Sequence, residues 1–304
     1  MNALDFFTKA YSLLHNYPGV PYWVLTPLRK IVRFGANKVL PKYLERPYPI
    51  SGQSDNKVIV SFTSFPARIN NVWQVVECMK RQTYRPAKII LWLSKDQFSS
   101  VECIPQSLRD REGELFEIRL VEGDIRSHKK YYYVFKEYTG SLVFLIDDDI
   151  YYPTDIIEKS MKEYLRGESA VVSNYGFLIK YNNLKILPYK KWQRMVHYST
   201  SPNLFFGSGG GTLIDTSEIH PICTNIDLAV QLTPIADDIW LNAVVRFSNL
   251  RVSMLKNGFL LPVYNVNNVK LAEQNLWNNQ NDLQLHSVIE YFREKEKTEI
   301  FGLR

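Results

Sequence analysis

Two kinds of apolar pattern alternate along the chain after residue 57. Short apolar runs predict strands, and stretches with apolar residues three or four positions apart predict helices. The predicted strands are "KVIVSF" (57–62), "KIILWL" (88–93), "FEIRLV" (116–121), "LVFLI" (142–146) and "AVVSNY" (170–175). The predicted helices between them are 71–82, 129–138 and 154–166, the last with Thr154 as its N-cap. Strands that alternate with helices predict an α/β fold with a mostly parallel sheet flanked by helices.

The pattern becomes less regular after about residue 175. "GSGGGTLI" (207–214) predicts a glycine-rich turn that enters a strand, and "ADDIWLNAVVRFSN" (236–249) predicts an amphipathic helix. A last helix is predicted at roughly 282–297. Before the alternating part, "ERPYPISGQSDNK" (45–57) is rich in Pro, Gly and Ser, which is typical of a linker. The linker separates a first segment of about fifty residues from the α/β part.

This first segment, residues 1–50, predicts a helical extension with an unusual charge. It holds seven Lys and Arg residues against Asp5 and Glu45, which is +5 of the net charge of +6. Bulky apolar residues such as Trp23 and Leu28 lie among the basic ones. Two interpretations stay open: peripheral contact with a membrane surface, or packing on the main domain with a solvated basic face. Nucleic-acid binding is not expected, because nothing after residue 50 continues the basic excess.

Composition limits the class of protein. The chain has 304 residues, of which 45% are hydrophobic and 22% charged, as in ordinary globular domains. Its three cysteines are far apart, which argues against a disulfide framework or a thiolate zinc site and favours a reducing cytosol. No signal-peptide pattern is present, and no apolar run reaches the roughly 18 residues of a membrane span. We therefore expect a cytoplasmic protein, with the inner face of the plasma membrane as a second possibility.

Three consecutive carboxylates, Asp147, Asp148 and Asp149, follow the apolar run 142–146 directly. Ligands of open α/β sheets bind beyond the carboxyl ends of the strands, which is where these residues fall. Alternation along a strand predicts that Asp147 and Asp149 face the same side while Asp148 points elsewhere. Two oxygen ligands beside open positions suit Mg²⁺ or Mn²⁺ with a bound diphosphate. The alternative is a solvated acidic turn.

Several motifs in order along the chain resemble those of GT-A glycosyltransferases. They are "SFTSFPARI" (61–69), "RQTYRPAKIILWLS" (81–94), "DIRSHKKYY" (124–132), "FLIDDDIYYP" (144–153) and "ADDIWL" (236–241). As a set they are most similar to bacterial surface-polysaccharide (capsule and lipopolysaccharide) glycosyltransferases with an Asp-X-Asp motif. The resemblance covers roughly 57–290 and leaves the first fifty residues out. It implies a GT-A type, Rossmann-like fold.

The resemblance implies a nucleotide-sugar site. In such enzymes the loop after the first strand lines the nucleotide pocket, and a glycine turn of this kind lines the donor-sugar and acceptor pocket. Asp147 is then near the ribose or the metal, Asp149 binds the metal, and Asp148 assists. Lys129 is the preferred phosphate contact, although a solvated helix start would have the same sequence. The implied donor-binding residues are Thr63, Ser64, Phe65, Pro66, Ala67, Arg68, Asp124, Arg126, Lys129, Lys130, Gly209 and Gly210.

The second acidic pair, Asp237 and Asp238, opens a predicted helix. Aspartates there commonly cap free N–H groups, and the helix dipole is expected to lower their pKa values. The resemblance implies instead that Asp238 is the catalytic base and that Asp237 supports it or the acceptor. A late histidine serves as a metal ligand in some enzymes of this fold, so His286 is a candidate third ligand. The alternative is that His286 has a structural role or is solvated.

The expected function is a metal-dependent glycosyltransferase. It would move a sugar from a nucleotide-diphosphate sugar, such as a UDP-sugar, to a hydroxyl of a glycan or lipid-linked glycan, with inversion. The expected halves are 57–175 for the donor and 176–290 for the acceptor, followed by a tail at 291–304. The alternatives are a retaining transferase, a metal-dependent nucleotidyltransferase or phosphohydrolase, and a non-catalytic glycan-binding protein.

Overall fold

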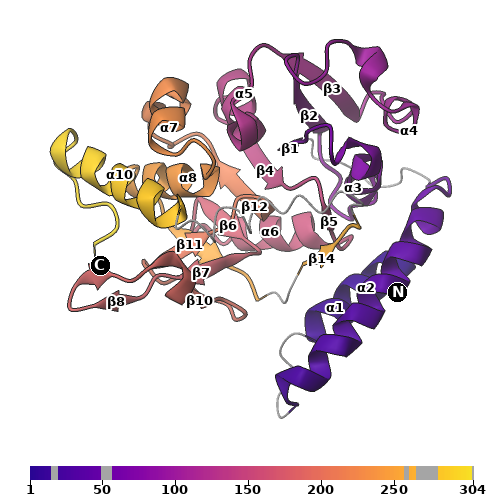
Figure 1. Cartoon of the computed structure of the whole chain (residues 1–304), viewed down its shortest axis with the longest axis horizontal. Helices are drawn as coiled ribbons and strands as arrows, with labels where there is room; N and C mark the ends of the chain where they lie inside the picture. The colour runs from indigo at the N-terminus through magenta and orange to yellow at the C-terminus, as the bar shows by residue number, and fades with distance from the viewer. Residues whose placement is uncertain (15–19, 49–56, 257–259, 265–279, 303–304) are drawn as a thin grey trace.

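A computed structural model describes residues 1–14, 20–48, 57–256, 260–264 and 280–302 of the chain (Figure 1). Most of the predicted linker, 49–56, lies outside the described residues. The largest sheet has seven strands in the order β13-β6-β12-β4-β1-β2-β3. Their bounds are β1 Val58–Thr63, β2 Lys88–Ser94, β3 Phe116–Val121, β4 Leu142–Ile146, β6 Val171–Ser173, β12 Gly210–Asp215 and β13 Val252–Met254.

The sheet is mostly parallel, as the sequence predicts. Strands β1, β2, β3 and β4 pair in parallel, and so do β6 and β13. Strand β12 lies between β4 and β6 and is antiparallel to both. The mixed α/β fold class is therefore confirmed, with one reversed strand in the middle of the described sheet.

Helices cover both faces of the sheet because alternate residues of each strand are buried on opposite sides. In β1, Val58, Val60 and Phe62 pack in one apolar core with α3, α4 and α6, whereas Ile59 packs in the other with α5, α8 and α10. The bounds of these helices are α3 Val72–Lys80, α4 Gln106–Arg109, α5 Lys129–Glu137, α6 Ile156–Tyr164, α8 Asp237–Phe247 and α10 Gln280–Glu294. Helix α7, Ile226–Leu232, lies beside α8.

Smaller sheets and short helical turns occupy the connections. A three-stranded sheet has the order β10-β7-β11, and β14 pairs with β5 and β8 with β9. The strand bounds are β5 Ile150–Tyr151, β7 Gly176–Leu178, β8 Tyr181–Asn182, β9 Lys185–Ile186, β10 Gln193–Arg194, β11 Leu204–Phe206 and β14 Leu261–Pro262. The 3-10 turns are Ile69–Asn71, Val101–Cys103, Arg126–His128, Tyr189–Lys191 and Pro221–Thr224.

The N-terminal segment forms a hairpin of two helices, α1 Ala3–Leu13 and α2 Tyr22–Leu44, at the edge of the α/β body (Figure 1). Its inner side is part of the core, since Leu4, Leu40 and Leu44 are fully or almost fully buried there. The side chain of Arg81 donates hydrogen bonds to the carbonyl of Leu44 at 2.9 Å. Within the described residues, none of the helices has the combination of length and hydropathy needed to cross a bilayer.

The predicted capping role of Thr154 is wrong. Asp155 occupies the N-cap position of α6, and its side chain makes no capping hydrogen bond. Thr154 instead donates through its backbone N–H and its hydroxyl to the two carboxylate oxygens of Asp5, each at 2.8 Å. Thr154 is therefore bound to Asp5, 149 positions away in the sequence, instead of capping α6 as local sequence rules predict.

Candidate active site

The carboxyl ends of β1 and β4 open into a cavity of about 1220 Å³. This is the position that ligands occupy in open α/β sheets. Nearly all of the side chains singled out from the sequence line it: Thr63, Ser64, Phe65, Arg68, Asp124, Arg126, Lys129, Lys130, Asp147, Asp148, Asp149, Gly209, Gly210, Asp237 and Asp238. Pro66 and Ala67 are not among the lining residues. The cavity thus gathers residues that lie far apart in the sequence, from Thr63 to Asp238 in this set.

Asp148 and Asp149 are held together by Arg68. The guanidinium Nη1 lies 2.8 Å from an oxygen of Asp148 and 2.9 Å from one of Asp149. Ser64 donates a second hydrogen bond to Asp148 at 2.5 Å. Burial raises the pKa of Asp148 although Arg68 and Ser64 oppose the shift. Burial and the neighbouring Asp148 raise the pKa of Asp149 to about 7.

This arrangement corrects the expectation that Asp148 points away from the site. Strand β4 ends at Ile146, so the three aspartates lie in the turn before β5 and the alternation of strand side chains does not apply to them. Asp148, expected to point elsewhere, is the most buried of the three and shares Arg68 with Asp149. Asp147 is directed to a different cation.

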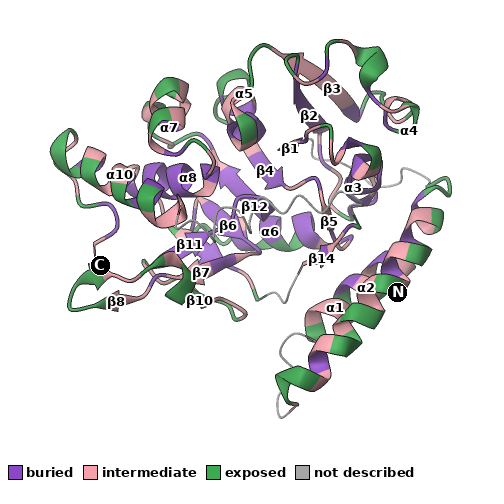
Figure 2. Cartoon of the chain, viewed as in Figure 1, coloured by how far each residue is buried: buried purple, intermediate pink, exposed green. Residues whose placement is uncertain are grey.

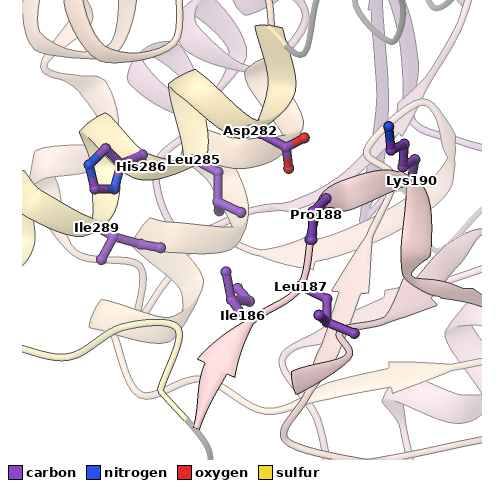
Figure 3. A pocket seen from close by; sticks show the side chains of 8 residues that line it. All are labelled: Ile186, Leu187, Pro188, Lys190, Asp282, Leu285, His286 and Ile289. Atoms are coloured by element: carbon purple, nitrogen blue, oxygen red, sulfur yellow. The ribbon is translucent and has the colours of Figure 1, made fainter. Parts of the chain in front are cut away.

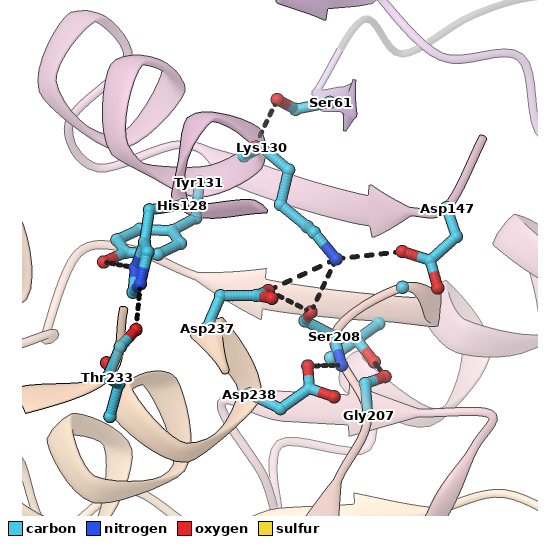
Figure 4. Close-up of polar contacts among 12 residues, drawn as sticks. Ser61, His128, Lys130, Tyr131, Asp147, Gly207, Ser208, Thr233, Asp237 and Asp238 are labelled. Carbon is cyan, nitrogen blue, oxygen red and sulfur yellow. Dashed lines mark hydrogen bonds and ion pairs between the residues drawn. The ribbon is translucent and has the colours of Figure 1, made fainter. Parts of the chain in front are cut away.

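Lys130 is that cation, and it lies at the centre of a buried polar network (Figure 4). Its Nζ is 2.9 Å from Asp147 Oδ1, 3.2 Å from Asp237 Oδ2 and 3.2 Å from the hydroxyl of Ser208. Burial lowers the pKa of Lys130, but Asp147, Asp237 and Asp238 raise it by more, so the ammonium stays charged. The lysine therefore joins the turn after β4 to the start of α8.

The two aspartates of α8 have different environments. Ser208 donates its hydroxyl to Asp237 at 2.8 Å and its backbone N–H to Asp238 at 2.7 Å. Burial raises the pKa of Asp237, but Lys130, His128 and the nearby serine hydroxyls outweigh burial and lower it. Among the described residues, no cation lies as close to Asp238 as Lys130 lies to Asp237. Burial and the charge of Asp237 raise the pKa of Asp238 to about 7.

The expectation that the helix dipole lowers both pKa values is therefore wrong for Asp238. The dipole acts at the helix start, but loss of water and a carboxylate one residue away have larger effects there. A carboxylate with a pKa near 7 accepts a proton more readily at neutral pH than an ordinary aspartate does. The structure thus separates Asp237, whose pKa is lowered, from Asp238, whose pKa is about 7.

The donor-side residues form a second group at the cavity wall. Lys129, expected to contact phosphate, forms an ion pair with Asp124. Asp124 also accepts hydrogen bonds from the side chain of Gln97 and the backbone N–H of Arg126, at 2.8 Å and 2.9 Å. Arg126 adopts a φ of 52°, which places this turn in the left-handed region. Lys130, rather than Lys129, is the lysine that reaches the acidic turn.

The glycine turn 207–211 permits close packing against Asp147. A Cβ at Gly209 would lie 1.8 Å from Asp147 Oδ1, which no real Cβ atom tolerates. The backbone also fixes the turn, because the N–H of Asp147 donates to the carbonyl of Gly209 at 3.0 Å. Only glycine fits here, since any side chain would displace the carboxylate.

Gly209→Ala is therefore expected to move Asp147 away from Lys130. We expect a loss of about 1–3 kcal/mol in the free energy of unfolding, as in overpacked cores, and at least tenfold weaker nucleotide binding. Urea unfolding and nucleotide titration measure the two effects. Gly113→Ala is the matched control, because a Cβ at that exposed glycine meets nothing within 4 Å. Equal behaviour of the two variants would contradict the close approach.

His286 is not brought to the aspartates. It lies on α10 in a separate pocket of about 370 Å³ formed with the segment 186–190 (Figure 3). Its Nε2 is 3.1 Å from Glu290 on the same helix. Within the part of the chain that the structure describes, no three His, Cys, Asp or Glu side chains converge as a metal site would require. The expected ligand set of Asp147, Asp149 and His286 is thus not assembled.

The donor chemistry of the turn still fits a hard divalent cation. The side chains of Asp147 and Asp149 remain 40% and 29% exposed, and both line the cavity. Two carboxylates with free oxygen lone pairs suit Mg²⁺ or Mn²⁺ when water and phosphate oxygens complete the shell. Asp147 and Asp149 are the residues that would hold such an ion.

Sequence reasoning missed an aromatic wall on the far side of the cavity. Tyr175, Phe177 and Tyr189 line it together with Arg194, whose guanidinium lies 4.2 Å from the centre of the Tyr175 ring. Tyr11 of α1 also reaches the cavity. Their spacing in the sequence has no recognisable pattern, because they come from separate short elements: the bend before β7, β7 itself, the 3-10 turn Tyr189–Lys191 and β10.

Comparison with known proteins gives likenesses of fold at low identity. No protein-family model matches the chain, and neither does any curated protein. The mannosyltransferase PcManGT from Pyrobaculum calidifontis, solved with GDP-Man and Mn²⁺, is 11% identical with a TM-score of 0.49, over 96% of this chain and 76% of that one. The 4-diphosphocytidyl-2C-methyl-D-erythritol synthase from Anaerococcus prevotii is 12% identical with a TM-score of 0.44, over 74% and 96%. A putative glucose-1-phosphate thymidylyltransferase from Bacillus anthracis is 13% identical with a TM-score of 0.42, over 73% and 95%.

Proposed function

We propose that the chain is a metal-dependent glycosyltransferase that moves a sugar from a nucleotide-diphosphate sugar to a hydroxyl group of a glycan. The donor is a UDP-sugar, and the acceptor is a bacterial surface glycan or its lipid-linked precursor. The anomeric configuration is inverted, with Asp238 as the base. The site of action is the cytoplasm, at the inner face of the plasma membrane.

The observation that carries this proposal is the pairing of two different acidic groups in one cavity. On one side, Asp147 and Asp149 offer oxygen ligands beside Arg68, which suits a metal and a diphosphate. On the other side, Asp238 has a pKa of about 7. Inverting sugar transfer needs both: charge compensation for the leaving diphosphate and a base for the acceptor hydroxyl.

The protein's own residues have distinct proposed tasks. Arg68, Lys129 and Lys130 line the cavity and provide positive charge toward the phosphates. The divalent ion, when bound at Asp147 and Asp149, supplies further charge compensation for the leaving diphosphate. Asp238 takes the proton of the acceptor hydroxyl, and Asp237 keeps Lys130 and Ser208 in place. Tyr175 and Tyr189 present aromatic faces on which acceptor sugar rings can stack.

Three alternative enzyme types give different products. A retaining transferase of the same fold would need no protein base, and the anomeric proton signal in the NMR spectrum of the product would show the retained configuration. A nucleotidyltransferase would release pyrophosphate, and a phosphohydrolase would release nucleotide or phosphate, in both cases without a glycan acceptor. Nucleotide release that depends on the acceptor supports glycosyl transfer and excludes these two.

The donor site is tested by thermal shift with nucleotides and nucleotide sugars, with and without Mn²⁺. A bound donor is expected to stabilise the protein by mass action, about 2.7 kcal/mol at one hundred times its Kd, and only with the metal present. Asp149→Ala should lose the metal-dependent stabilisation and the transfer activity, because one of the two carboxylate ligands is removed. Asp155→Ala, outside the cavity, is the control. Normal turnover by Asp149→Ala would show that the metal assignment is wrong.

A further inference from the structure

The helical hairpin has an outward face that the α/β body does not cover. On α2, Trp23, Ile31 and Phe34 are 77%, 66% and 67% exposed. The opposite side of the same helix is buried in the core through Leu40 and Leu44. In Figure 2 the ribbon of the hairpin is mostly green and pink, the colours of exposed and intermediate residues. Large apolar side chains at 3.6-residue spacing on an exposed face mark an interaction surface.

Lysines accompany these apolar side chains, and acidic groups are almost absent. Lys30, Lys38 and Lys42 are exposed and fall within the same outward sector of α2 when its residues are placed at 100° intervals. Asp5 is directed inward, where both of its oxygens accept hydrogen bonds from Thr154. Glu45 is the other acidic residue of the hairpin in the described part of the chain. The surface thus combines bulky apolar groups with net positive charge.

We infer that this outward face of α2 binds the surface of an anionic lipid bilayer. An interfacial helix buries its apolar side chains at the boundary of headgroups and acyl chains, while lysines on the same helix extend toward anionic headgroups. Tryptophan is typical of that boundary. Charge complementarity favours anionic lipid over a second copy of this chain, since two copies of the face would bring lysines against lysines.

The hairpin is also fixed to the rim of the catalytic cavity. Asn37 of α2 donates to the carbonyl of Pro262 at 3.2 Å, and its Oδ1 accepts from the N–H of Tyr264 at 2.6 Å. Between those two residues, the N–H of Val263 donates to the carbonyl of Asp149 at 2.8 Å. Binding of α2 to a bilayer therefore holds the acidic turn near the lipid surface. This part rests on the proposed function, and it points to an acceptor glycan carried on a lipid.

Co-sedimentation with vesicles tests the inference without donor or acceptor, so its outcome is independent of the enzymatic proposal. The full chain is mixed with phosphatidylcholine vesicles that contain either no anionic lipid or 30% phosphatidylglycerol as a probe, on the order of the anionic content that polybasic surfaces recognise. We expect strong binding to the anionic vesicles, weak binding to the neutral ones, and release by high salt.

Two sets of substitutions separate the apolar from the charged part. The apolar set Trp23→Ser, Ile31→Ser and Phe34→Ser should lower partitioning onto anionic vesicles by at least tenfold. The charge set Lys30→Glu, Lys38→Glu and Lys42→Glu should remove the preference for anionic lipid. Lys162→Glu on α6 and Leu165→Ser at its C-cap are matched controls, because both residues are exposed outside the hairpin. Circular dichroism checks that each variant is folded.

Three results would overturn the inference. One is absence of wild-type protein from the anionic vesicle pellet. Another is equal binding of the wild type and both variant sets. The third is a dimer in lipid-free solution that the apolar set converts to a monomer, which would make the face a contact between copies.

Discussion

Asp238→Asn is expected to lower the rate of sugar transfer by about 10²–10⁴-fold, the usual contribution of a general base. In the wild type the backbone N–H of Ser208 donates a hydrogen bond of 2.7 Å to Asp238. Asparagine keeps an oxygen that can accept this bond, but it cannot take up the proton of the sugar acceptor's hydroxyl group. Affinity for the donor should change by less than about twofold, since the donor residues lie on other segments. Steady-state kinetics with a nucleotide-binding titration measure both quantities.

The wild-type pH profile provides an independent measurement of the same group. Asp238 must be ionised to act as a base, and its pKa is about 7. We therefore expect kcat/KM to rise with pH up to about 7 and then to level off. Asp227→Asn, at an exposed position in the first turn of α7, should change neither rate nor profile. Loss of donor affinity in Asp238→Asn would place the residue in the donor site instead.

The same substitution is expected to stabilise the fold at neutral and alkaline pH. An aspartate whose pKa is raised on folding, from about 4 to about 7, destabilises the folded state when it is ionised. Asp238→Asn removes that cost, so the free energy of unfolding should rise by about 1–3 kcal/mol above pH 7. The gain should shrink as the pH falls from 7 to 4. In that range the wild-type carboxyl of the folded state takes up a proton and no longer carries a buried charge.

Lys130→Met is expected to have the largest effect on stability. It removes the buried cation shared by Asp147 and Asp237 and leaves their charges uncompensated. Removal of one partner of a buried pair typically costs about 3–5 kcal/mol. Urea unfolding at pH 7.5 measures the loss. The loss should be smaller at lower pH, because without Lys130 the main influence that opposes burial at Asp237 is gone and the pKa of that carboxyl rises.

Two further variants make this prediction specific. Lys136→Met alters an exposed lysine of the same helix, and a change within about 0.5 kcal/mol is expected. Combining Lys130→Met with Asp237→Asn removes one of the two carboxylates that lost their cation. The double variant should therefore regain part of the lost free energy of unfolding. A double variant as unstable as the sum of the single ones would mean that Lys130 acts by packing rather than by charge.

Much of the fold follows from the sequence because the strands are locally determined. The apolar run at 142–146 coincides with β4, since a buried parallel strand needs continuous apolar residues. The alternating run at 116–121 coincides with β3, an edge strand that is mostly half-buried. The reversed direction of β12 could not be predicted, because "GSGGGTLI" determines a turn and a strand but not their neighbours. Thr154 was misassigned for the same reason: its partner, Asp5, lies in the distant hairpin.

The membership of the candidate site is easier to predict than its connections. Each of the expected acidic residues lines one cavity. Asp124 and the turn 147–149 follow the ends of β3 and β4, and the start of α8 brings Asp237 and Asp238 to the same edge of the sheet. Which of these residues form ion pairs depends on the length and direction of each side chain. Arg68 contacts both Asp148 and Asp149, and Lys130 contacts Asp147 and Asp237. The spacing of these residues in the sequence predicts neither contact.

The position of β12 has a consequence for the order in which the protein can be made. Its neighbours, β4 and β6, are synthesised 37 or more residues earlier, yet β12 fills the gap between them. Until residue 215 has left the ribosome, β4 has an open edge with unpaired backbone groups, which is a template for aggregation. The two expected halves, 57–175 and 176–290, therefore share one sheet and cannot each complete it alone.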